Sequence, residues 1–134
     1  MGDLSENFSR HEFTCKCGCG YDAVHPLLIQ TLQHMRNRAG VPITITSGCR
    51  CHAHNARVGG AKASRHMSGV AADFVIQGWD ADRTMALIHQ LVVNDEAYVG
   101  YAYKVPRTRQ EVVHLDVRIP ESMTVRRWKN DREA

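Results

Sequence analysis

Hydrophobic positions recur along the chain at two spacings, one typical of helices and the other of strands. In the segment 26–39, apolar side chains follow one another at steps of four, three and four residues, which predicts an amphipathic helix. Pro26 suits its first turn and Gly40 its end. The run 43–46 alternates apolar and polar residues, which is typical of a half-buried strand. The apolar positions of the helix are Leu28, Leu32, Met35 and Ala39.

The middle of the chain combines a loop with a strand that contains one acid. The segment 51–60 predicts a short helix, followed by a loop over 61–68. The run 70–76 is almost continuously apolar and predicts a buried strand, yet it contains Asp73. A buried carboxylate is costly unless it is paired or binds a metal. Asp73 is therefore a candidate functional residue.

A second helix is predicted to begin after Asp80, whose side chain can cap it, and to end near Asn94. Its apolar face is predicted to consist of Met85, Ile88 and Val92.

Two late strands are predicted over 98–103 and 112–118. Helices and strands without regular alternation predict an α+β fold, with the helices on one side of a small, mostly antiparallel sheet.

Length and composition predict one folded domain over residues 1–134. The chain is 43% hydrophobic and 23% charged, close to the average for globular proteins. No run approaches the roughly 18 apolar residues of a membrane span. The net charge is only +3, and Asp131 and Glu133 dilute the basic residues near the end, which argues against nucleic-acid binding. We also expect a monomer.

The spacing of His66, Asp73 and His114 predicts a metal site. A catalytic zinc ion usually has three protein ligands and an open fourth position. His66 lies in a loop just before the strand of Asp73, and His114 lies within the last strand, on the same face as Asp116. The alternative is a hydrogen-bonded core histidine beside a salt-bridged aspartate. The helical H-E-x-x-H zinc motif is absent, because His11 and Glu12 have no second histidine at the required spacing.

The motifs around these residues resemble a known family. Residues 64–73 match S-x-H-x-x-G-x-A-x-D, and residues 114–116 match a later H-x-D. Together they resemble the M15 family of zinc D-Ala-D-Ala peptidases, which includes VanX-type dipeptidases and phage L-Ala-D-Glu endolysins. The segments 12–19, 45–50 and 54–60 and the pair Arg127 and Trp128 also resemble its small members.

The resemblance implies a fold shared with the hedgehog signalling domain, with Zn²⁺ bound by His66, Asp73 and His114. It also implies that Glu111, three residues before the last histidine, is the general base. In a regular strand Glu111 and His114 face opposite sides, unless Glu111 precedes the strand or a bulge intervenes. Asp116 is the competitor, either as base or as the acceptor that fixes the imidazole ring.

Two further residues are assigned to the site by this resemblance. Arg50 is expected to stabilise the oxyanion or to bind a substrate carboxylate, and the alternative is a surface arginine. Ser64 is expected either to line the substrate pocket or to cap the backbone of its loop.

The five cysteines, at positions 15, 17, 19, 49 and 51, form C-x-C-x-C and C-x-C but no C-x-x-C. Three interpretations stay open: free thiols, a disulfide between the two clusters, and a second metal site.

The expected function is hydrolysis of a peptide bond in peptidoglycan stem peptides, as a D-Ala-D-Ala carboxypeptidase or an L-Ala-D-Glu endopeptidase. The polar and acidic start lacks the pattern of a secretory signal, so we expect synthesis in the cytoplasm, action on the bacterial cell wall and possible phage or prophage origin. The alternative is a non-catalytic, zinc-stabilised cell-wall-binding or phage structural domain.

Overall fold

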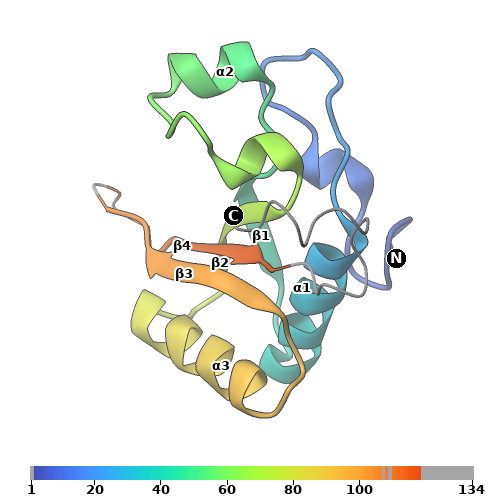
Figure 1. Cartoon of the computed structure of the whole chain (residues 1–134). Helices are drawn as coiled ribbons and strands as arrows, with labels where there is room; N and C mark the ends of the chain where they lie inside the picture. The colour runs from blue at the N-terminus through green and yellow to red at the C-terminus, as the bar shows by residue number, and fades with distance from the viewer. Residues whose placement is uncertain (1, 107, 109, 119–134) are drawn as a thin grey trace, which may run out of the picture.

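A four-stranded antiparallel sheet forms the centre of the structure, with the strand order β1-β2-β4-β3. The computed structural model describes residues 2–106, 108 and 110–118. The predicted α+β class and the antiparallel sheet are confirmed (Figure 1). The strands are β1 (Ile43–Ser47), β2 (Ala71–Ile76), β3 (Val99–Lys104) and β4 (Val113–Val117).

The two long helices pack against one face of this sheet. They are α1 (Pro26–Ala39) and α3 (Ala81–Val93). Among the described residues there are also three short helical segments, namely η1 (Arg10–Phe13), α2 (His52–Arg57) and η2 (Arg65–Ser68). Figure 1 shows α3 below the sheet and α2 above it. The sheet therefore separates a helix-covered core from a second face bordered by short segments and loops.

The alternation of side chains along β4 explains why its two faces differ. Val113, Leu115 and Val117 belong to the hydrophobic core, whereas His114 and Asp116 line a cavity on the other face. This is the arrangement predicted from the period of a strand. All five residues of β4 are buried because the strand lies inside the sheet. The largest core side chains include Phe13, Leu28, Leu32, Met35, Phe74, Ile76 and Leu91.

The helix boundaries follow the capping signals in the sequence. Pro26 begins α1, and Gly40 ends it in the left-handed conformation, with a φ of 72°. The Asp80 carboxylate accepts a hydrogen bond from the Arg83 N–H at 2.8 Å, which confirms Asp80 as the cap of α3.

The predicted apolar face of α3 is wrong in part. Ile88 is buried, but Met85 is only partly buried and Val92 is 41% exposed. The face toward the sheet consists instead of Ala81, Thr84, Leu87, Ile88 and Leu91. The predicted and the observed set of residues lie side by side along the helix. The set that packs against the sheet is the one that contains the two leucines.

No helix in the described part of the chain combines the length and apolar character needed to cross a membrane. Arg127 and Trp128, and the basic residues around them, lie outside the described residues.

Candidate metal centre and active site

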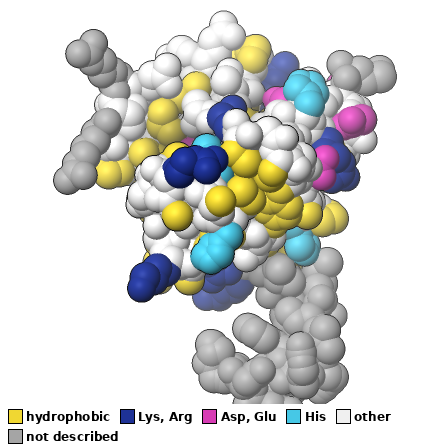
Figure 2. Space-filling view, turned by 90° about the horizontal axis from the view of Figure 1, so that it is seen from above, with side chains coloured by type: hydrophobic (Ala, Val, Ile, Leu, Met, Phe, Trp, Pro, Cys, Tyr) yellow, Lys and Arg dark blue, Asp and Glu magenta, His cyan; other side chains and the backbone are white. Residues whose placement is uncertain are grey.

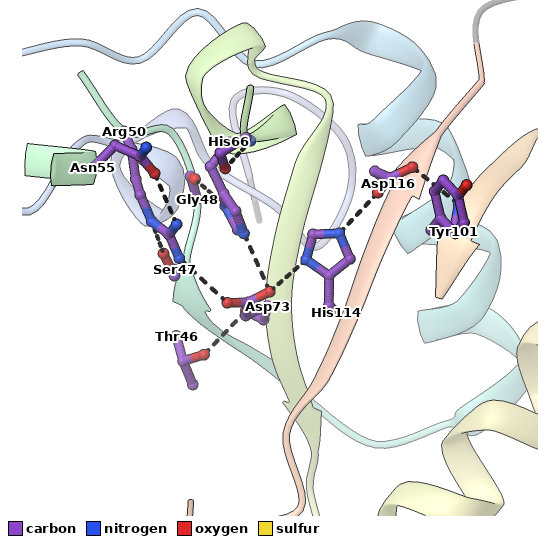
Figure 3. A network of polar contacts seen from close by, with 11 residues as sticks. Thr46, Ser47, Gly48, Arg50, Asn55, His66, Asp73, Tyr101, His114 and Asp116 are labelled. Carbon is purple, nitrogen blue, oxygen red and sulfur yellow. Dashed lines mark hydrogen bonds and ion pairs between the residues drawn. The ribbon is translucent and has the colours of Figure 1, made fainter. Parts of the chain in front are cut away.

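Three buried side chains that are far apart in the sequence meet on the face of the sheet opposite α3. His66 comes from η2, while Asp73 in β2 and His114 in β4 are direct partners across the two strands. Asp73 Oδ1 lies 3.2 Å from His66 Nε2 and 2.9 Å from His114 Nδ1 (Figure 3). Donor atoms of all three residues lie within 4.8 Å of one another. The structure thus brings together the three residues predicted as metal ligands.

The other nitrogen of each imidazole ring is held by an acceptor. His66 Nδ1 lies 2.7 Å from the Gly48 carbonyl oxygen, and His114 Nε2 lies 2.8 Å from Asp116 Oδ2. Carbonyl and carboxylate oxygens only accept, so these two nitrogens must carry the protons. If neither ring carries a second proton, each directs a lone pair at Asp73 Oδ1, which also only accepts. The lone pairs and the carboxylate oxygen then repel one another unless protons or a metal cation lie between them.

The pKa values of this cluster show how strongly its charges interact. Burial by itself would lower the pKa of His114, but the hydrogen bonds to Asp116 and Asp73 outweigh it and raise this pKa to about 9. Burial would raise the pKa of Asp73, but the hydrogen bonds to His114 and His66 hold it well below its ordinary value. Asp73 is therefore ionised over the whole physiological range, as a metal ligand must be.

The donor set fits zinc. Two imidazole nitrogens and one carboxylate oxygen form a three-ligand set of the type found in catalytic zinc sites. The hydrogen bonds from the far ring nitrogens to Gly48 and Asp116 are the outer contacts that orient metal-binding histidines.

A bulge in β3 positions Asp116. The register of β3 against β4 shifts between Val99 and Tyr101, which leaves Gly100 opposite the Asp116 carboxylate. Asp116 Oδ1 accepts a hydrogen bond from the Tyr101 N–H at 3.0 Å. A Cβ on residue 100 would lie 2.6 Å from the same oxygen, so this close approach requires glycine. Both oxygens of Asp116 are thus engaged, one with the backbone and one with the His114 ring.

Arg50 points into the site from the segment that follows β1. Its guanidinium group lies 3.6 Å from Asp73 Oδ2 and donates hydrogen bonds to Ser47 Oγ at 3.3 Å and to Asn55 Oδ1 at 3.1 Å (Figure 3). The buried Asn55 is held in turn by its bond to the Ala61 carbonyl at 2.8 Å. Arg50 is therefore an anchored side chain of the site, not a free surface arginine.

Ser64 has a structural contact as well as a place at the site. Its hydroxyl oxygen accepts a hydrogen bond from the His66 N–H at 3.2 Å and caps η2. The segment ends at Gly69, which has a φ of 73° and touches the Ala23 carbonyl so closely that a Cβ would collide with it. The short helix is thus fixed at both ends, which orients His66.

These residues line a cavity of about 590 Å³. Arg50, Ser64, His66, Asp73, His114 and Asp116 all contribute to its wall. Tyr103 stacks on the His114 ring, with centroids 4.5 Å apart and an angle of 14° between the planes. Figure 2 views the molecule from above and shows basic and histidine side chains next to a group of hydrophobic side chains. The volume suits a short peptide or another small ligand.

The structure does not bring Glu111 to the triad. Glu111 precedes β4, and its exposed side chain accepts a hydrogen bond from the Ala81 N–H at 2.8 Å, at the start of α3. Glu111 therefore contacts the helices that cover the core. Residues two apart in an extended segment face the same side, and Val113 faces the core. Among the described residues, the carboxylates that line the cavity are those of Asp73 and Asp116.

Asn55, Tyr101 and Tyr103 are parts of the site that the sequence analysis did not assign. Asn55 lies in a segment that carries the family resemblance, which is the one signal that could have identified it. The tyrosines alternate with Gly100 and Ala102 along β3, and only the register with β4 shows that they border the cavity.

Two comparisons with known proteins give a match. The family model described as Peptidase M15 matches residues 6–116, a range that includes the triad and Arg50. Among solved structures, the chain is similar to the crystal structure of the Serratia marcescens L-Ala D-Glu endopeptidase ChiX, with 19% identity and a TM-score of 0.52. The similarity covers 71% of this chain and 80% of that one, and at this identity it shows the fold. No curated protein sequence gives a significant match.

Proposed function

Because the chain belongs to the peptidase M15 family, as its motifs indicated, we propose that it is a zinc-dependent peptidase that hydrolyses a bond in peptidoglycan stem peptides. The observation that supports this proposal most directly is the buried cluster of His66, Asp73 and His114 in the wall of a cavity that also contains Arg50. The reaction is of the D-Ala-D-Ala carboxypeptidase or the L-Ala-D-Glu endopeptidase type.

His66, Asp73 and His114 would hold the zinc ion, which supplies an activated water and polarises the scissile carbonyl when bound. Arg50 directs a cationic group into the same cavity, where it can stabilise the developing negative charge on the carbonyl oxygen or bind a substrate carboxylate. Asn55 and Ser47 fix this guanidinium group, so little reorganisation is needed when a substrate binds.

The charge of the cavity supports an acidic peptide as substrate. Arg50 and Arg65 line it together with Asp73 and Asp116, so a zinc ion held by the triad would leave the wall with a net positive charge. Stem peptides carry free carboxylates, which a cationic wall can bind. The named activity of the similar Serratia marcescens structure is consistent with such a substrate.

For the acid on which turnover depends, we propose Asp116 in place of Glu111. Glu111 would have to leave Ala81 and reach the opposite face of the sheet, whereas Asp116 already lies in the cavity wall and holds the His114 ring. A carboxylate of this kind typically contributes 10-fold to 100-fold to metal affinity or activity.

Two isosteric variants test this assignment. Asp116→Asn is expected to lower turnover by roughly 10-fold to 100-fold, because an amide is a weaker acceptor for the ring N–H. Glu111→Gln is expected to retain turnover within about 2-fold, because its contact is with the start of α3. Peptide hydrolysis and bound zinc are measured for both. Loss of turnover in Glu111→Gln with zinc retained would instead make Glu111 the base.

The function itself is tested by incubating the zinc-loaded protein with purified stem peptides and identifying the fragments by mass spectrometry. The fragment masses also identify the bond. His114→Ala is expected to lose both hydrolysis and the zinc bound at the triad, because it removes one ligand. His89→Ala is the matched control, since His89 is an exposed histidine on α3 outside the cavity.

A zinc-loaded protein that cleaves no stem peptide would contradict the proposal. Binding of intact peptidoglycan without release of any fragment would then favour the alternative, a non-catalytic domain of the cell wall or of a phage particle.

A further inference from the structure

Four of the five cysteine side chains gather at one place, away from the histidine cluster. Cys15, Cys17 and Cys19 come from the loop after η1, and Cys51 is the residue that caps the start of α2. Their sulfur atoms all lie within 4.8 Å of one another. Cys15 is buried, Cys51 is partly buried, and Cys17 and Cys19 are exposed. Two segments more than thirty residues apart thus contribute to one cluster of thiols.

The spacing of the sulfur atoms is that of metal ligands. Cys17 Sγ lies 3.5 Å from Cys15 Sγ and 3.6 Å from Cys51 Sγ. A disulfide requires about 2.05 Å, so these pairs are not bonded. Four sulfurs arranged as a tetrahedron at about 2.3 Å from a zinc ion are about 3.8 Å apart. The two separations from Cys17 Sγ are close to this value before any adjustment of side-chain rotamers, and the other sulfur pairs lie within 4.8 Å.

The backbone around the cluster is shaped to present these sulfurs. Gly18 and Gly20 have φ values of 89° and 90°, a conformation that side chains other than glycine rarely adopt. They let the loop fold back, so that the Cys15 N–H bonds the Tyr21 carbonyl at 2.8 Å. Alternate cysteines, which would point in opposite directions along a strand, converge here because the chain turns between them.

Backbone N–H groups also point at two of the sulfurs. Cys15 Sγ accepts from the Cys51 N–H at 3.4 Å, and Cys51 Sγ accepts from the His54 N–H at 3.3 Å. Such hydrogen bonds favour the thiolate, which is the form that binds a metal. The first of them also joins the two segments directly.

We propose that Cys15, Cys17, Cys19 and Cys51 form a structural zinc site, separate from the histidine site, that fastens the loop after η1 to the start of α2. Four thiolates leave no open position for water, so this ion would be structural. Cys51 directly follows Arg50, and α2 carries Asn55, which bonds the Arg50 guanidinium. The site would therefore also hold in place the segment that positions Arg50.

Metal content measured by elemental analysis tests the proposal, because it is independent of any peptidase activity. The full chain, purified under reducing conditions with zinc and then dialysed, is expected to contain about two zinc ions. The double variant Cys17→Ser, Cys19→Ser is expected to contain about one, and so is the double variant His66→Ala, His114→Ala. Cys49→Ala is the matched control, since Cys49 lies outside the cluster, and it should retain both ions.

Cobalt substitution identifies the ligands of the second ion. Thiolate-to-cobalt charge-transfer absorption is expected in the full chain and in the double variant His66→Ala, His114→Ala, and it should be absent from Cys17→Ser, Cys19→Ser. If the cysteine variant fails to fold, the presence or absence of this absorption in the histidine variant still decides the test. A full chain without this absorption, or a cysteine variant with unchanged zinc content, would overturn the proposal.

Thiol labelling of the unfolded, unreduced and chelated protein examines the main competitor. Five reactive thiols are expected, one for each cysteine. A protein in which two of the four clustered cysteines resist labelling contains a disulfide, and the zinc site would then be rejected. If stem peptides are still cleaved while no zinc is bound by the cysteines, only this inference fails, and the proposed function stands.

Discussion

Arg50 shows how single residues depend on their contacts in this site. Its guanidinium group is shared among Asp73, Ser47 and Asn55, and its own backbone N–H bonds the His66 carbonyl at 3.0 Å. A planar fork of donors can satisfy several acceptors at fixed angles, whereas an ammonium group cannot. The residue type therefore matters here beyond its charge.

Replacing Arg50 by lysine is expected to lower kcat/KM by roughly 10-fold to 100-fold, because the charge is retained but the multiple hydrogen bonds are lost. Zinc content should be unchanged, since Arg50 is not among the three predicted ligands. Stem-peptide kinetics and metal analysis measure the two effects. Arg57→Lys, at an exposed position on the same helix as Asn55, serves as the control. Equal kinetics for both variants would remove Arg50 from the mechanism.

The pKa of His114 predicts how the stability of the metal-free protein depends on pH. This pKa is raised from 6.5 to about 9, so the protonated ring stabilises the fold fully below pH 6.5 and loses this effect as the pH rises through about 9. Asp73 acts in the opposite direction, because its pKa is lowered from 3.8 and its contribution is lost only in acid. The pair thus stabilises the chain most between about pH 4 and 6.5.

Urea unfolding of the chelated protein is expected to show a fall in the free energy of unfolding between pH 6.5 and 9. The fall should be at most about 3 kcal/mol. His114→Gln should remove this fall, since it has no titrating group at that position. A profile for the unsubstituted chain as flat as that of the variant would show that His114 does not titrate in this range.

At the scale of elements, the site depends on how segments end and bend. The loop after α2 contains two consecutive glycines with different surroundings. Gly59 has a φ of 73° and no atom near the place of a Cβ. A Cβ on residue 60 would instead collide with the Asn55 side chain and lie 2.9 Å from Arg50 Nη1. One glycine is needed for the backbone conformation, and the other for the close approach of side chains.

The variants Gly59→Ala and Gly60→Ala are expected to affect different properties, the first stability and the second catalysis. Gly60→Ala should lower kcat/KM by roughly 10-fold, because it displaces Asn55 and the guanidinium group that Asn55 holds. Gly59→Ala should lower the free energy of unfolding by about 1–2 kcal/mol through its positive φ and leave kcat/KM nearly unchanged. Thermal unfolding and peptide kinetics of both variants make the comparison. The same kinetic loss in both would show that the loop acts only through its backbone.

The elements also show what could be predicted from the sequence. The period of β4 placed His114 and Asp116 on one face, and the caps placed both ends of α1, because these features depend on local steric rules. The apolar face of α3 was wrong in part, because two adjacent stripes on a helix can be told apart only by the sheet that covers one of them. Glu111 lies three residues before His114, as the family motif requires, but its carboxylate contacts the start of α3 and not the triad.

At the scale of the whole molecule, the sheet has two faces with separate roles. One is covered by α1 and α3 and forms the core, and the other bears the triad between β2, β4 and η2. The motifs indicated that the three ligands meet, whereas the particular contacts of Asn55, Tyr103 and the cysteines required the path of the chain in space. Such long-range contacts leave no periodic pattern in the sequence.

Because the triad lies on the face of the sheet opposite the core, metal removal is expected to affect the stability of the folded protein. Zinc would replace the proton that His114 shares with Asp73 in the metal-free protein, and an ion bound only by the folded chain should stabilise that chain. Zinc at about 100 times its dissociation constant would add about 2.7 kcal/mol for each site, which corresponds to a Tm higher by roughly 10 °C. Differential scanning calorimetry at neutral pH, with chelator and then with zinc restored, measures this change.

The variants separate the contributions to this change in Tm. His66→Ala, His114→Ala should retain only the part of the zinc effect that comes from the cysteines. Asp80→Ala should lower Tm by an amount that zinc does not alter, because it removes a cap of α3 on the other face of the sheet. A full chain whose Tm is the same with chelator and with zinc would contradict this prediction and would mean that the triad keeps its arrangement without a metal ion. The pH profile of the chelated protein would then describe the native state of the enzyme.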